Sequence, residues 1–139
     1  MQFQALHPGF ILPTRGSEDA GAFDIYMPES GNVSGYSQKV GLGFCAAVPL
    51  NKVALVLPRS GVGSMFGLEL NNTAAVIDSD YRGEWFAFLK TKSDAPYWWK
   101  KGDRLLQFLL LPVYRPRLEL VETLDTTLRG TGGLGSTGA

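Results

Sequence analysis

The sequence has few of the residues from which disulfides, metal sites and membrane anchors are built. Its 139 residues include one cysteine, Cys45, and one histidine, His7, which excludes an intrachain disulfide and a zinc site made of Cys and His side chains. The longest apolar runs, residues 53–57 and 108–111, are too short to cross a bilayer. The N-terminus also lacks the basic and apolar regions of a signal peptide. We therefore expect a soluble protein of the cytoplasm, or of the host cytoplasm if the source is a phage, without stable membrane binding.

An excess of charge of one sign is also missing. The 13 Lys and Arg residues balance the 13 Asp and Glu residues, so the formal net charge is zero. Non-specific binding to nucleic acid usually shows as a basic excess, so we expect no stable nucleic-acid binding. If the protein binds phosphates, it does so with a few placed groups. The length and the 45% of hydrophobic residues suit one globular domain.

What the chain has instead is a series of short, strand-like segments. Its 17 Gly and 8 Pro residues separate runs rich in β-branched and aromatic residues, at residues 23–26, 53–57, 74–77, 84–90 and 104–113. One helical turn is expected after Pro58, at residues 61–65. The pattern predicts an all-β domain, a barrel or a sandwich. Residues 1–128 would form this domain, and residues 129–139 a glycine-rich C-terminal arm that becomes ordered on something else.

Two polar clusters in the first half of the chain are candidates for a site. Residues 17–25 place one carboxylate, Asp24, between apolar neighbours, where an Asp that caps a turn is the ordinary interpretation. Residues 57–63 follow a strand with Arg59, Ser60 and two glycines. Backbone amides, a hydroxyl and a guanidinium in one place can cradle phosphate, although the same composition suits an ordinary turn.

A third cluster, residues 71–85, predicts a hairpin whose tip carries Asp78, Asp80 and Tyr81. A carboxylate at a strand end can act as a general base toward water, and a neighbouring tyrosine can stack on a ring. The alternative is a turn stabilised by Asx hydrogen bonds.

Two more clusters lie near the C-terminus. Gln107 is the only polar side chain between Leu105 and Val113, so it either has a partner or faces solvent. Residues 129–138 combine one Arg, five glycines and hydroxyl groups without a carboxylate. Such a segment can wrap a polyphosphate, or it can be a low-complexity tail.

The order and spacing of these five clusters resemble the trimeric dUTPase family. The resemblance covers nearly the whole chain and is most specific at residues 58–61, 76–84, 102–107 and 129–138. It implies a jelly-roll-like β-barrel, a homotrimer with shared active sites, and an arm that closes over the substrate. The implied reaction is Mg²⁺-assisted hydrolysis of dUTP to dUMP and pyrophosphate, which keeps uracil out of DNA and supplies dUMP for thymidylate synthesis.

The resemblance also implies roles for individual residues. Asp78 would be the catalytic base that activates a water for in-line attack on the α-phosphate, and Asp24 would contact Mg²⁺ through water. Uracil and deoxyribose would be bound by Asn72, Ala75, Val76, Ile77, Tyr81 and Leu134, with Tyr81 excluding a ribose. The phosphates would be bound by Arg59, Ser60, Gly61, Gln107, Arg129, Gly135, Ser136 and Thr137.

Three residues depart from the family pattern. Leu134 stands where an aromatic residue usually covers the uracil, and Ala75 and Ala22 replace glycines. These changes concern affinity rather than the type of reaction. Two alternatives remain. The sequence of residues 78–81 argues against a dCTP deaminase-like enzyme, and the presence of Asp78, Arg129 and Ser136 argues against a catalytically silent dUTP-binding regulatory protein.

Overall fold

The computed structural model describes residues 1–93, 95–134 and 136, and almost all of its regular structure is β-strand. The strands are β1 (Gln2–Ala5), β2 (Thr14–Arg15), β3 (Phe23–Tyr26), β4 (Gly31–Val33), β5 (Gln38–Ala47), β6 (Lys52–Pro58), β7 (Leu68–Leu70), β8 (Ala75–Ile77), β9 (Glu84–Thr91), β10 (Tyr97–Trp99) and β11 (Arg104–Pro112). One short helix, α1 (Ser60–Phe66), occurs within the described ranges. The all-β prediction and the helical turn after Pro58 are confirmed. Nowhere in the described residues is there a helix both long enough and apolar enough to cross a membrane.

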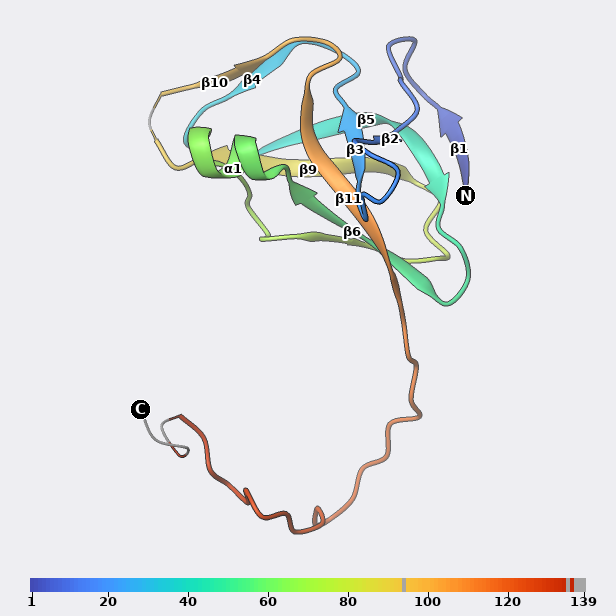
Figure 1. The fold of residues 1–139 in the computed structure, drawn as a ribbon, viewed down its shortest axis with the longest axis vertical. Coiled ribbons are helices and arrows are strands. Elements are labelled where there is room, and N and C mark those ends of the chain that lie inside the picture. The colour runs from blue at the N-terminus through green and yellow to red at the C-terminus, as the bar shows by residue number, and fades with distance from the viewer. Residues whose placement is uncertain (94, 135, 137–139) are drawn as a thin grey trace.

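The strands pair antiparallel in three sheets (Figure 1). The first has the order β1-β5-β9-β7, the second β2-β3-β11-β6-β8, and a small third sheet pairs β10 with β4. Apolar side chains of the two larger sheets form one buried core. This arrangement fits the predicted jelly-roll fold. No ladder between described residues closes the sheets into a complete barrel.

The centre of the core is aromatic. Trp85 of β9, Phe44 of β5 and Phe108 of β11 are all fully buried, and the Trp85 ring lies 5.2 Å from Phe44 and 5.4 Å from Phe108 between ring centroids. Each such pair contributes about 0.5–1.5 kcal/mol beyond the burial of its area. Because side chains alternate along a strand, burying Trp85 directs Glu84 and Phe86 to the opposite face of β9. That face borders a pocket.

The C-terminal segment leaves this body after β11. Val113 still donates its backbone N–H to the Asn51 carbonyl, at 3.0 Å, but the described residues that follow form no helix or strand. Figure 1 shows them extending away from the sheets. Leu118, Leu120 and Leu128 are 89%, 101% and 111% exposed. Such a row of apolar side chains has no partner within the described chain.

Candidate active site

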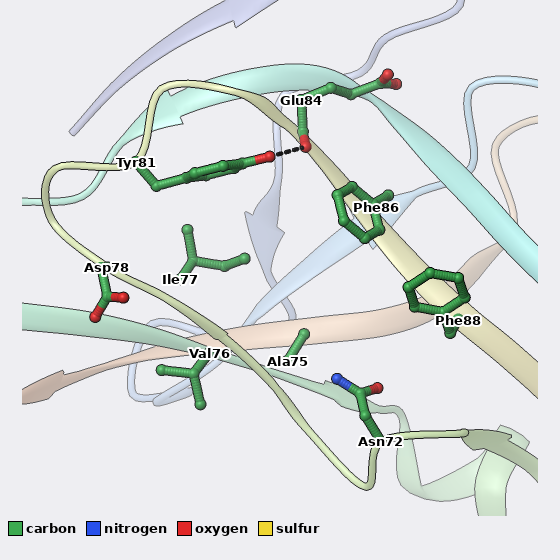
Figure 2. Close-up of a pocket in the computed structure, with 9 residues that line it drawn as sticks. All are labelled: Asn72, Ala75, Val76, Ile77, Asp78, Tyr81, Glu84, Phe86 and Phe88. Carbon is green, nitrogen blue, oxygen red and sulfur yellow. Dashed lines mark hydrogen bonds between the residues drawn. The ribbon is translucent and has the colours of Figure 1, made fainter.

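The first of two pockets lies between β8 and the start of β9. β8 is the edge strand of its sheet, and β7 pairs only with the far end of β9, from Leu89 to Thr91. A cavity of about 260 Å³ therefore remains between two free strand edges. It is lined by Asn72, Ala75, Val76, Ile77, Asp78, Tyr81, Glu84, Phe86 and Phe88 (Figure 2). We call it the base pocket.

Polar groups of the base pocket are held by local hydrogen bonds. Asn72 belongs to the turn before β8, and its side-chain Nδ2 donates to the Ala74 carbonyl at 3.0 Å. The Tyr81 hydroxyl donates to the Glu84 carbonyl at 3.0 Å, so the ring lies across the pocket beside Ile77 (Figure 2). Fixed rings and amides of this kind give a pocket a defined shape before a ligand enters.

Asp78 occupies the rim of the base pocket. It directly follows β8, its side chain is exposed, and its backbone carbonyl accepts the Tyr81 N–H at 3.3 Å to form the turn. A carboxylate in this position can reach both the pocket and the solvent from which a water would come. The structure therefore brings together five of the six residues predicted to bind uracil and deoxyribose. Asp78, the predicted catalytic base, lies beside them.

The second pocket, of about 520 Å³, lies between β3, β6, β11 and the start of α1. Pairing of Gln107 with Asp24 on one side and with Leu57 on the other carries three distant segments to the same place. The lining residues are Gly16, Ala20, Gly21, Ala22, Asp24, Arg59, Ser60, Gly61, Val62, Met65, Phe66 and Gln107. We call it the phosphate pocket, because it contains every phosphate-binding residue predicted outside the arm.

Gln107 and Asp24 both have partners there. Gln107 donates its Nε2 to the Pro58 carbonyl at 3.2 Å, which explains a polar residue within an apolar strand. Asp24 is 7% exposed, and its two oxygens are taken by two guanidinium groups: Arg59 Nε lies 2.9 Å from Oδ1, and Arg104 Nη1 lies 3.1 Å from Oδ2. Two cations and one anion leave this cluster positive, which suits an anionic ligand.

Comparison with known proteins decides the family. A profile of the dUTPase family matches residues 9–138. The chain belongs to the dUTPase family. It is 41% identical over 133 residues to the deoxyuridine 5'-triphosphate nucleotidohydrolase of Dictyoglomus turgidum, which covers 91% of this chain and 90% of the relative. It is 40% identical to the same enzyme of Paramecium bursaria Chlorella virus 1, over 91% of this chain and 89% of that one.

Solved dUTPase structures share the fold. The dUTPase of Staphylococcus bacteriophage 80alpha, solved with dUpNHpp, superposes with a TM-score of 0.87 over 99% of this chain and 98% of that chain, at 23% identity. The expected family and fold are therefore confirmed. At this identity the superposition speaks for the fold alone.

The described residues provide no protein cage for a metal ion. They contain no cluster of three or more His, Cys, Asp or Glu residues that could hold one. Asp24 is the only acidic residue among the described residues lining the phosphate pocket, and each of its oxygens already has a guanidinium partner. Mg²⁺ keeps several waters and is commonly held through substrate phosphates. The lining of this pocket thus offers one carboxylate, that of Asp24, to such an ion. A related phage phi11 dUTPase structure describes a structural Mg(II) ion.

The described residues of the arm lie apart from both pockets. Among the described residues, none beyond Gln107 lines the phosphate pocket, and the C-terminal segment extends away from the body (Figure 1). Arg129 donates its Nε to the Gly132 carbonyl at 2.9 Å, and Leu134 is 109% exposed. Ser136 is described within a local turn, whereas Gly135 and Thr137 fall outside the described residues. None of the described arm residues lines either pocket.

Several residues of the site escaped the sequence analysis. Glu84, Phe86 and Phe88 line the base pocket, and Arg104 binds Asp24. Glu84, Phe86 and Phe88 alternate with the apolar residues Trp85, Ala87 and Leu89 along β9, and this alternation could have predicted that the three share one face of the strand. Arg104 lies inside the Gly102–Gln107 stretch that resembles the family, but its contact with Asp24 spans 80 residues of sequence.

Proposed function

We propose that this chain hydrolyses dUTP to dUMP and pyrophosphate, and thereby keeps uracil out of DNA and supplies dUMP. The observation that carries the proposal is the pair of pockets. The base pocket is largely apolar and is bordered by free backbone groups of β8 and by Asp78. The phosphate pocket is lined by Arg59 and Gln107. A nucleobase suits the first pocket, and a triphosphate suits the second. Membership of the dUTPase family supports the same substrate.

Base recognition would use the backbone as well as side chains. β8 pairs with β6 on one side, and its other edge faces the base pocket. Free N–H and C=O groups of that edge, with the Asn72 amide, can bind the polar edge of uracil. A wrong base leaves such groups unpaired, which makes polar recognition selective. Tyr81 would pack under the deoxyribose and leave no room for a ribose hydroxyl.

Phosphate binding would use the second pocket. Arg59 and Gln107 supply side-chain donors, and Ser60 and Gly61 begin α1, whose Ncap residue, Arg59, makes no side-chain cap hydrogen bond. A Cβ added at Gly61 would meet nothing within 4 Å, so the backbone there is open to a ligand. Mg²⁺ held by the phosphates would offset their charge.

Asp78 would act as the general base. Its carboxylate would accept a proton from a water whose oxygen attacks the α-phosphorus in line. The bond between the α-phosphorus and the oxygen bridging to the β-phosphate would break, and pyrophosphate would leave. Proton transfer to a positioned base contributes about 10²–10⁴-fold to a rate, so positioning and charge stabilisation supply the rest.

A homotrimer with shared active sites is part of the proposal. The base pocket and the phosphate pocket share no lining residue in the described part of the chain, and the described C-terminal segment extends away from the sheets. Its exposed leucines would be covered by a neighbouring copy, since burying one leucine stabilises by about 1.5–3 kcal/mol. The arm residues Arg129, Gly135, Ser136 and Thr137 would then bind phosphates, and Leu134 would cover the uracil. The proposal includes a cytoplasmic location, without stable binding to nucleic acid or membranes.

The test is pyrophosphate release from dUTP with Mg²⁺, beside dTTP, dCTP and UTP, with light scattering for the oligomeric state. We expect release from dUTP alone and the mass of three chains. Ammonia from dCTP would identify a deaminase instead. Tight binding of dUTP without release would identify a silent binding protein. The comparisons lend no support to either alternative.

A further inference from the structure

Glu84 lines the base pocket, yet the proposed reaction gives it no step. It is the first residue of β9, immediately after the hairpin that carries Asp78 and Tyr81. Its side chain accepts a hydrogen bond from β5, and its backbone carbonyl accepts one from Tyr81.

The carboxylate of Glu84 occupies an irregularity in β5. The ladder between β5 and β9 shifts between Gly41 and Cys45, and Gly43 there has a φ of +75°. The Gly43 N–H, which the shifted ladder leaves without a strand partner, donates to Glu84 Oε1 at 3.1 Å. A Cβ at Gly41 would lie 2.6 Å from the same oxygen, so Gly41 leaves room for this carboxylate while Gly43 supplies the N–H. Bulges of this kind commonly re-aim a strand beside a site.

The carbonyl of Glu84 holds Tyr81. The Tyr81 hydroxyl donates to it at 3.0 Å, as the dashed line in Figure 2 shows. The ring can approach because Gly83 lies between them, and a Cβ at Gly83 would collide with the Tyr81 hydroxyl. The orientation of the ring therefore depends on where the start of β9 sits, and the Glu84 carboxylate adds a bond to Gly43 beside the ladder pair of Glu84 and Cys45 that joins this start to β5.

We infer that Glu84 is a positioning residue that sets the Tyr81 ring and, through it, discrimination between deoxyribose and ribose. The inference rests on the proposed function, because it takes the sugar of dUTP to lie against Tyr81. The carboxylate acts as a hydrogen-bond acceptor toward Gly43 N–H, so an amide of the same shape can replace it. The role is distinct from a purely structural one, which would change stability and leave sugar selectivity unchanged.

The experiment compares kcat and KM for dUTP and UTP in the full-length protein and in E84A, E84Q and Y81F. Loss of the acceptor in E84A is expected to raise KM for dUTP several-fold, to leave kcat within about threefold, and to lower the dUTP-over-UTP ratio of kcat/KM by about tenfold. E84Q keeps the acceptor and is expected to keep most of the selectivity. Y81F removes the donor to the same carbonyl, so its effect and that of E84A should not add in the double variant.

E69A is the matched control, because Glu69 is a carboxylate of the same sheet whose ion-pair partners are Lys90 and Lys92. If E84A fails to fold, G41A tests the same step, since its Cβ displaces the Glu84 carboxylate while the glutamate remains. Wild-type protein that hydrolyses dUTP selectively, with folded E84A or G41A equally selective, would overturn the inference. Loss of selectivity in E84Q equal to that in E84A would also overturn it. Wild-type protein that does not hydrolyse dUTP would overturn the proposed function instead, and dUMP and UMP binding to the same variants would still test the positioning role.

Discussion

The base pocket and the phosphate pocket differ in how much of their chemistry a single chain completes. In the base pocket, Tyr81 is held by Glu84, and Asn72 is held by its own turn, so the polar groups are in place without a ligand. In the phosphate pocket, the Arg59 guanidinium is bound to Asp24, and the described residues of the arm do not line the pocket. The polar groups of the base pocket are thus held by bonds within one hairpin and its neighbours, whereas the arginine of the phosphate pocket is held by an ion pair with a residue of another strand.

The largest effect is expected from Asp78. It tests whether this carboxylate is the general base that acts on a substrate bound in both pockets. D78N removes the proton acceptor but keeps the shape of the side chain, so we expect kcat to fall about 10³-fold while dUTP binding changes less than about threefold. Steady-state rates and calorimetric titration with a non-hydrolysable dUTP analogue measure the two quantities. D80N, in the same turn, is the control. A decrease below tenfold would assign the base to another group.

Removal of the arm tests the division between the pockets directly. A chain that ends at residue 128 is expected to show a KM for dUTP raised about tenfold or more, because the phosphates lose Arg129 and its neighbours. Binding of dUMP should weaken less than about threefold, since Leu134 is the one arm residue expected at the base and the described lining of the base pocket lies within residues 72–88. Calorimetry with dUMP and the dUTP analogue compares them. Equal weakening of both ligands would mean that the arm serves the base as much as the phosphates.

The sequence predicted the parts of this site that lie in continuous segments. The apolar runs that became β3, β6, β8, β9 and β11 are visible because β-branched and aromatic residues gather between glycines and prolines. β5 was missed, because Gly41 and Gly43 interrupt its pattern. Those glycines serve a bulge that receives a side chain from β9, and this requirement arises only once the strands are paired.

Residue types alone do not predict which side chains form ion pairs and hydrogen bonds with one another. Asp24 was predicted to stand near a metal ion, and its two arginine partners come from segments that only the sheet brings together. The same holds for Glu84, whose role depends on register rather than on composition. Short motifs thus predict which groups are present, and long-range strand pairing decides what each group touches.

Loss of the Asp24 carboxylate should destabilise the phosphate pocket. D24N would leave the Arg59 and Arg104 guanidinium groups facing each other without their shared anion. Because the two arginines are 34% and 41% exposed, we expect a loss of about 2 kcal/mol in the free energy of unfolding, less than for a fully buried pair. Urea unfolding measures it, with D19N in the exposed turn as the control. An unchanged midpoint would show that solvent already screens this cluster.

The smallest effect is expected outside both pockets, on β7. A hydrogen bond from Lys92 is the main cause that lowers the pKa of the Glu69 carboxyl below its ordinary value of 4.5, and the charge of Lys90 adds to it. Because the folded-state pKa is lowered, the contribution of this pair to stability is present above the ordinary pKa and is lost as the pH falls through the folded value. The pair is exposed, so its loss should change the free energy of unfolding very little. A carbon NMR titration should show the Glu69 pKa rising toward 4.5 in K92M and rising less in K90M. The reverse order would assign the main effect to Lys90. A marked loss of stability in K92M would show that this surface pair contributes as much to the free energy of unfolding as the buried Asp24 carboxylate of the phosphate pocket.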